Sequence, residues 1–118
     1  MGLRDLAKRL SVSVEQIDDE RLQDRFTNLD VTKIGAVTPR TQSRIGGEIT
    51  RTRITPRSGV PSFEISISDG TGTAVAVFTG RRHMPGLEHH RAVVLEGVPR
   101  SERGRMVMLN PAYTLLPH

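Results

Sequence analysis

Five short segments between residues 44 and 116 have the composition of β-strands, and one irregular stretch separates the third segment from the fourth. The clearest strand is residues 62–68, where a phenylalanine and two isoleucines alternate with serines and a glutamate, the period of a strand with one face in water. A glycine-rich turn follows, and the apolar run at residues 74–78 then returns as the second strand of an antiparallel hairpin. This order of segments predicts a small, strongly bent sheet.

The other strands are expected at residues 44–54, 91–98 and 105–109, with residues 112–116 continuing the edge or capping the end. Gly46 and Gly47 lie where the first strand must bend sharply to pair with both halves of the sheet. A proline and a glycine limit residues 81–90 to at most a helical turn. Five strands in this order predict a mainly β fold, the five-stranded OB-fold barrel.

The first 43 residues have no strand periodicity. Apolar residues at positions 3, 6, 7 and 10 predict a short amphipathic helix, and Ser13 followed by Gln16 matches a capping box that begins a second helix. Residues 33–37 are expected to be extended. We therefore divide the chain into an N-terminal helical arm at residues 1–30, a connector at residues 31–43 and the OB-fold barrel domain at residues 44–118.

The length of 118 residues suits one hydrophobic core. Without cysteine the chain has no disulfide, no thiolate nucleophile and no thiolate ligand for zinc. No run approaches the roughly 20 apolar residues that a membrane-spanning helix needs, and the N-terminus lacks the apolar core of a signal peptide. We therefore expect a soluble, cytoplasmic protein with no membrane association.

The formal net charge of +4 is unevenly distributed along the chain. Residues 1–39 contain six basic and seven acidic residues, whereas residues 40–118 contain eleven basic and six acidic ones. All eleven of these cations are arginine, which suits bidentate phosphate contacts and stacking on bases. An arginine-rich composition without functional meaning explains the same excess, since the chain has lysine only at positions 8 and 33.

An OB barrel that binds single strands needs a basic groove along the nucleic-acid backbone and flat side chains on which bases stack. Two loops border the usual cleft of this fold. The candidate phosphate-binding residues near these loops are Arg51, Arg53 and Arg57 in one cluster and Arg100, Arg103 and Arg105 in the other. We expect the two clusters to converge across one face, the alternative being two solvated loops.

Arg81 and Arg82, next to His83, form the densest basic spot and either extend the phosphate track or belong to a solvated connector. Aromatic residues are scarce. Phe78 points outward and could stack a base if Val75 and Val77 face inward, and otherwise it fills the barrel. Because stacking is weak in either case, we expect modest, salt-sensitive affinity.

Several phrases of the chain, taken in order, resemble a known family. They are Gly47-Glu48-Ile49, Asp69-Gly70-Thr71-Gly72, Gly80-Arg81-Arg82-His83-Met84-Pro85-Gly86-Leu87 and Asn110-Pro111-Ala112-Tyr113. They are similar to small bacterial, chiefly actinobacterial, OB-fold nucleic-acid-binding proteins, and more distantly to the OB wedge domain of RecG-type helicases. The resemblance covers residues 44–116. It implies nucleic-acid binding, and it transfers no catalytic residue.

The chain contains no His-Glu-x-x-His motif, no nucleophile elbow and no P-loop. His89 and His90, as neighbours on a strand, would point in opposite directions and form no metal site. Gly70 and Gly72 lead into a strand rather than a helix, which disfavours a dinucleotide site. The sequence therefore predicts no enzyme, no catalytic residue, no cofactor and no metal.

Residues 6–17 also resemble the start of a helix-turn-helix motif. Asp18, Asp19 and Glu20 would then lie on the recognition helix, where DNA phosphates repel them. We therefore predict a non-catalytic OB-fold protein that binds single-stranded DNA or RNA mainly through arginine–phosphate contacts. The alternative is a protein–protein interaction module that uses the barrel and the helical arm.

Overall fold

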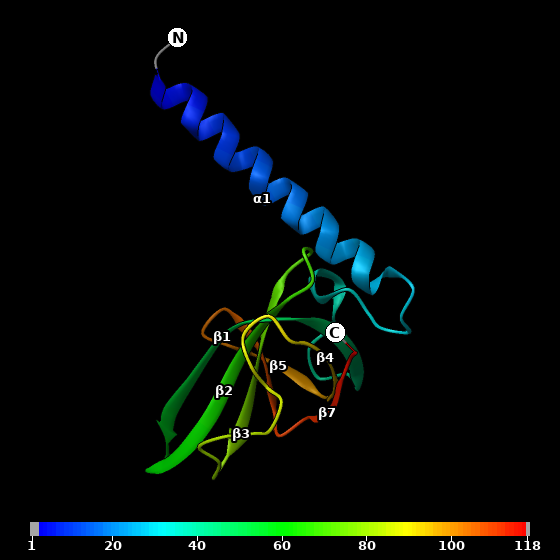
Figure 1. Ribbon diagram of the computed structural model, residues 1–118. Coiled ribbons are helices and arrows are strands. Elements are labelled where there is room, and N and C mark those ends of the chain that lie inside the picture. The colour runs from blue at the N-terminus through cyan, green and yellow to red at the C-terminus, as the bar shows by residue number, and fades with distance from the viewer. Residues whose placement is uncertain (1–2, 118) are drawn as a thin grey trace.

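The computed structural model describes residues 3–117, with side chains described from residue 14 onward. One long helix precedes a β-rich domain (Figure 1). The elements in chain order are α1 (Leu3–Thr27), the short 3-10 helix η1 (Ile34–Ala36), β1 (Ser43–Arg57), β2 (Val60–Ser68), β3 (Thr73–Thr79), β4 (Ala92–Gly97), β5 (Pro99–Glu102), β6 (Arg105–Leu109) and β7 (Ala112–Leu115). The predicted mainly β fold with an N-terminal helix is confirmed.

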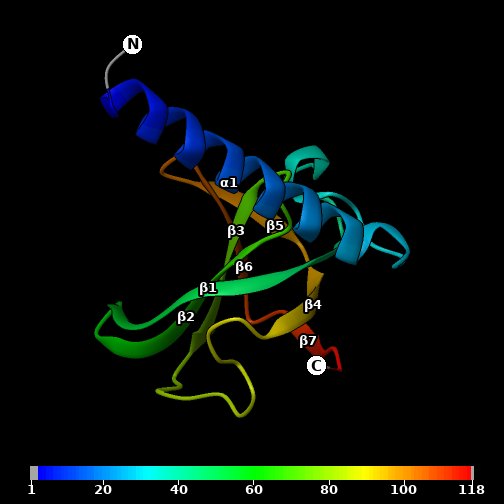
Figure 2. The same ribbon diagram turned by 45° about the horizontal axis from the view of Figure 1, so that its top comes forward.

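All of these strands belong to one curled sheet in the order β5-β6-β3-β2-β1-β4-β7 (Figure 2). β1 pairs antiparallel with two strands, with β4 along its first half and with β2 along its second half. Glu48 is the changeover residue, because it lies opposite both Ala92 of β4 and Ser68 of β2. A strand shared in this way curls the sheet into a partial barrel.

The sheet has seven strands rather than the predicted five. One addition is β7, and the other is β5, because the strand predicted at residues 91–98 continues past Val98 as a second piece. Pro99 has no N–H to donate to a ladder, which favours a break at this point. β4 pairs with β1 while β5 pairs with β6. The two pieces of the broken strand therefore pair near opposite ends of the sheet, and the short link at Val98 keeps these ends close to each other.

The bend in β1 does not lie at the two glycines. The register of β1 against β2 shifts between Ile49 and Arg51, which leaves Thr50 as the extra residue of a β-bulge. Such a residue bends the strand and increases its twist. Gly46 instead permits close packing, since a Cβ atom there would lie 2.9 Å from Cδ1 of Phe26.

The main core fills the inside of the curl. Phe63, Ile65 and Ile67 of β2 are all buried, as their alternation predicts. The segment between β3 and β4 forms turns rather than a helix, also as predicted, and its Leu87 reaches the core with 1% of its surface exposed.

Residues 3–27 form one continuous helix, which corrects the prediction of two helices with a boundary near Ser13. This segment has no glycine or proline, and extending an existing helix costs less than nucleating another. A continuous helix also leaves no turn for the helix-turn-helix alternative. The 3-10 helix η1 replaces the extended segment predicted at residues 33–37. In the described part of the chain, no helix has the length and apolar character needed to cross a membrane.

The last turns of α1 dock on the sheet. Leu22 and Phe26, each 4% exposed, form a second apolar cluster with Ala92 of β4. Above this cluster, Glu48 accepts hydrogen bonds from Nη1 of Arg21 at 2.9 Å and from Nη1 of Arg25 at 2.6 Å. The bond from Arg21, followed by that from Arg25, holds the pKa of Glu48 below its usual value despite the opposing effect of burial.

Replacing Gly46 with alanine should loosen the docking of α1. The new methyl group would collide with the packed ring of Phe26, and overpacking of this kind costs about 1–3 kcal/mol. Urea denaturation followed by circular dichroism measures the loss. Gly97→Ala is the matched control, because its new Cβ would lie 3.5 Å from the nearest atom, an ordinary contact with Pro111. Equal stability of the two variants would contradict the proposed packing.

Acid should weaken the anchor at Glu48. A carboxylate whose pKa is lower in the folded than in the unfolded state stabilises the fold above the unfolded pKa, and this contribution disappears as the pH falls through the folded pKa. We therefore expect the free energy of unfolding to decrease below about pH 4.5, the usual pKa of glutamate. Denaturation of wild type and Glu48→Gln across this range should show a weaker pH dependence in the variant.

Candidate nucleic-acid interface

One face of the sheet, turned away from the main core, gathers arginines from three strands. Side chains alternate along a strand, so the neighbours of the core residues point to this other face. Pairing aligns Arg53 of β1 with Glu64 of β2, and Glu64 with Val77 of β3. We call this surface the arginine face and define it by Arg51, Arg53, Arg57, Arg100, Arg103 and Arg105, together with Glu64 and Glu102.

Glu64 is the centre of a first group of charges. Its side chain is only 4% exposed, and its Oε1 lies 3.3 Å from Nη2 of Arg53 and 4.0 Å from Nη1 of Arg105. Arg53 comes from β1 and Arg105 from the start of β6. One nearly buried carboxylate therefore holds arginines from two strands that lie on opposite sides of β2 and β3.

Glu102 organises a second group in the same way. Its Oε1 accepts a 2.7 Å hydrogen bond from Nη2 of Arg57, and its Oε2 accepts one of 2.9 Å from Nε of Arg100. The bond from Arg57, followed by that from Arg100, lowers the pKa of Glu102 and keeps it ionised. Because Arg57 ends β1 and Glu102 ends β5, this ion pair joins the β1–β2 hairpin to the β5–β6 turn.

The structure thus brings the two sequence clusters of arginine together. The groups around Glu64 and Glu102 each contain one arginine from residues 51–57 and one from residues 100–105. Six arginines against two glutamates give the arginine face a formal charge of +4. The carboxylates also reduce the repulsion between guanidinium groups that would otherwise crowd one another.

The floor of the arginine face is aliphatic. Val75 and Val77 of β3 and Val107 of β6 form a cluster separate from the main core, with exposures of 4%, 0% and 0%. On one side Val107 lies opposite Arg100, and on the other Val75 lies opposite Ser66. These valines are almost wholly covered, so they support the face from below and leave it no aromatic surface on which a base could stack.

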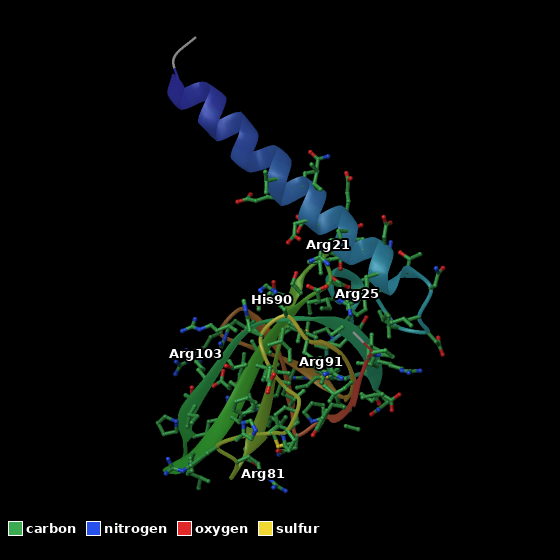
Figure 3. The ribbon with its side chains drawn as sticks, viewed as in Figure 1. Arg21, Arg25, Arg81, His90, Arg91 and Arg103 are labelled. Carbon is green, nitrogen blue, oxygen red and sulfur yellow. The ribbon has the colours of Figure 1, made fainter. Side chains whose placement is uncertain are left out.

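The remaining predicted cations occupy different places. Arg51 and Arg103 are exposed and, among the described residues, have no carboxylate within ion-pair distance. Arg81 and Arg82 are exposed in the segment after β3. Arg81 lies well away from Arg103 (Figure 3), so the structure separates the Arg81–Arg82 pair from the β5–β6 turn.

Phe78 does not point outward. It is 4% exposed in the main core and makes an edge contact with Tyr113, with ring centroids 5.7 Å apart. The outward residues of β3 are Val75 and Val77, because Phe78 pairs with the inward Phe63. The prediction that Phe78 could stack a base is therefore wrong, and the apolar run of β3 gave no alternation that could settle its direction.

The two adjacent histidines also differ from expectation. His89 and His90 lie in the turn before β4 rather than on a strand, and their rings are 3.9 Å apart. His90 has a φ of 70°, and its N–H bonds to the carbonyl of Ile49 at 2.8 Å. Because this segment is a turn, the two side chains do not diverge as neighbours on a strand would.

Sequence reasoning missed the two glutamates of the face. Glu64 had a usable signal, because it has the outward parity of the strand at residues 62–68 and a hairpin register would place it near Arg53. Glu102 had none, since residues 101–104 look like a turn and its partner Arg57 lies 45 positions away in the chain.

Comparison with protein-family models and with curated protein sequences gives no match. Among solved structures, the chain is similar to RecG bound to a three-way DNA junction, with a TM-score of 0.61 and 14% identity over 75% of this chain and 13% of that one. It is similar to an OB domain from Methanosarcina mazei, with a TM-score of 0.58 and 16% identity over 74% of this chain and 84% of that one. The second OB-fold domain of replication protein A from Methanococcus maripaludis gives a TM-score of 0.56 and 10% identity over 74% of this chain and 95% of that one. The described part of this chain therefore has an OB fold.

Proposed function

We propose that this OB domain binds single-stranded nucleic acid across the arginine face, without catalysing a reaction. The observation that carries the proposal is the convergence of arginines from β1, β5 and β6 on one surface, where Arg57 and Glu102 connect the two loop regions. Guanidinium groups form bidentate hydrogen bonds with phosphate, and a basic surface that follows the backbone is what an OB fold needs to bind a single strand. The similarity to RecG, whose structure contains DNA, supports the same class of ligand.

The chemistry of the face favours phosphate contacts over base recognition. Its floor is formed by valines, and all three phenylalanines of the chain are buried. Arginine contacts to phosphate are independent of base identity and weaken with salt. We therefore propose slight sequence preference and strong dependence on ligand length, with a site of roughly 4–16 nucleotides. That the protein comes from an actinobacterium, as its resemblance to actinobacterial OB-fold proteins implies, remains a prediction.

Removing Arg51 and Arg103 should weaken binding without disturbing the ion-paired groups. Two lost phosphate contacts should cost on the order of tenfold in affinity. They should also reduce the slope of log affinity against log salt by about 1.4 for a single strand. Fluorescence anisotropy of labelled oligonucleotides measures both quantities for the double variant Arg51→Gln, Arg103→Gln.

The matched control is Arg44→Gln, which removes one exposed arginine from the half of β1 that pairs with β4 and breaks a 3.1 Å ion pair with Glu96. Its affinity and salt slope should equal those of wild type. If the control weakens binding as much per arginine as the double variant does, net charge rather than the arginine face governs binding. If wild type binds no oligonucleotide even at low salt, the proposed function is wrong.

Glu102→Gln should bind the oligonucleotide more tightly. The substitution removes a negative charge from the face and releases Arg57 and Arg100 for phosphate. Anisotropy titrations at fixed salt compare the variant with wild type, and a denaturation curve verifies that it is folded. Weaker binding by a folded variant would mean that Glu102 serves the site by holding both arginines in position.

A further inference from the structure

The N-terminal part of α1 extends away from the sheet (Figure 1). Leu22 and Phe26, near its C-terminal end, are buried against the sheet at 4% exposure. Val14 and Ile17, farther out, are each 65% exposed. Contact with the sheet therefore stabilises only the last turns of this 25-residue helix and leaves Val14 and Ile17 without an apolar partner in the described structure.

The apolar positions along the extended part follow a heptad pattern. Counting along the helix, they are Leu3, Ala7, Leu10, Val14 and Ile17, with alternating steps of four and three residues. This spacing places the positions along one seam of a helix, as in two-stranded coiled coils. At 100° per residue, the mean direction of these five positions lies roughly 120° around the helix from that of Leu22 and Phe26. The seam therefore lies on a different side of α1 from the two apolar residues that dock the helix on the sheet.

Charge is segregated along the same helix. Positions 4–9 contain three basic residues and one acidic residue, and positions 15–20 contain four acidic residues and no basic one. Like charges four positions apart, such as Arg4 and Lys8 or Glu15 and Asp19, destabilise a helix that stands alone. The basic positions also lie near the helix N-terminus, where the macrodipole favours negative charge. A second helix whose acidic and basic segments run in the opposite order would place opposite charges beside these residues and reduce both unfavourable effects.

We propose that two copies of this chain associate through an antiparallel pair of α1 helices. With the midpoint at position 12, position 10 of one copy lies opposite position 14 of the other, and position 7 lies opposite position 17. The basic segment 4–9 of each copy then lies along the acidic segment 15–20 of its partner. A parallel pair would instead place like segments together, which is why the charge pattern selects the antiparallel arrangement.

This pairing uses neither the sheet nor the arginine face. α1 docks on the first half of β1 and on β4, while the arginine face is built from the second half of β1 with β2, β3, β5 and β6. The two barrels of the dimer would therefore lie at opposite ends of the helix pair, with both arginine faces uncovered. The inference does not rest on the proposed binding of nucleic acid.

Sedimentation equilibrium of the full chain tests the association. Wild type should have twice the monomer mass of 13.1 kDa at high concentration and dissociate on dilution. The double variant Val14→Asp, Ile17→Asp should remain at 13.1 kDa throughout, because it places charge in the seam. Both residues are exposed and far from the core, so the barrel should stay folded. A monomeric wild type, or a variant that still dimerises, would overturn the proposal.

The control variant Ile54→Asp, Val60→Asp changes two other exposed apolar residues, which are 54% and 45% exposed on the β1–β2 hairpin. It should dimerise as wild type does. Loss of dimerisation in this variant instead of in the helix variant would place the interface on the hairpin and overturn the proposal.

Spin labels determine the orientation of the helices. The chain has no cysteine, so Asp5→Cys and Val12→Cys each carry one label per copy. Position 5 lies seven residues from the midpoint, which separates its two labels by roughly 21 Å along the axis of an antiparallel pair. The labels at position 12 should be closer together than those at position 5. Equal distances at the two positions would indicate a parallel pair and overturn the proposed arrangement.

Discussion

The fold depends on β1 forming hydrogen bonds with two different strands. Its first half pairs with β4 and its second half with β2, and Glu48 belongs to both pairings. The bulge at Thr50 bends the strand just after this changeover. The first half therefore presents a surface on which α1 docks, and the second half curves to carry arginines toward β5 and β6. One strand thus positions both the arm and the candidate site.

Carboxylates give the arginine face its geometry. Glu64 and Glu102 each contact two guanidinium groups, and in each case the two arginines come from different strands. Neither an exposed ion pair nor one with a nearly buried carboxylate adds much net stability, because screening in the first case and desolvation in the second offset the attraction. The effect of these ion pairs is to hold the guanidinium groups of different strands close together in a fixed arrangement. A phosphate group bound at either glutamate as proposed would have to compete with a carboxylate already in place, which would limit its affinity.

The sequence was informative wherever periodicity was strict. Alternation in β2 correctly predicted that Phe63, Ile65 and Ile67 are buried, and the order of strands correctly indicated an OB fold. The apolar run of β3 had no alternation, so the direction of Phe78 could be decided only by pairing with β2. The ion pair of Arg57 with Glu102 depends on how far the sheet curls. Because that curl follows from the bulge and from the break at Val98, local sequence patterns do not reveal it.

The anchoring of α1 at Glu48 has a consequence for how the molecule opens. Detaching the end of the helix would leave a nearly buried carboxylate without its arginines and would expose Phe26 and Ala92 to water. Glu48 is the residue of β1 shared by both halves of the sheet, and Ala92 lies opposite it in β4. The last turns of α1 and the centre of the sheet should therefore form a single cooperative unit of hydrogen exchange. The extended part of the helix, which makes no such contact at Val14 or Ile17, should exchange independently of the barrel.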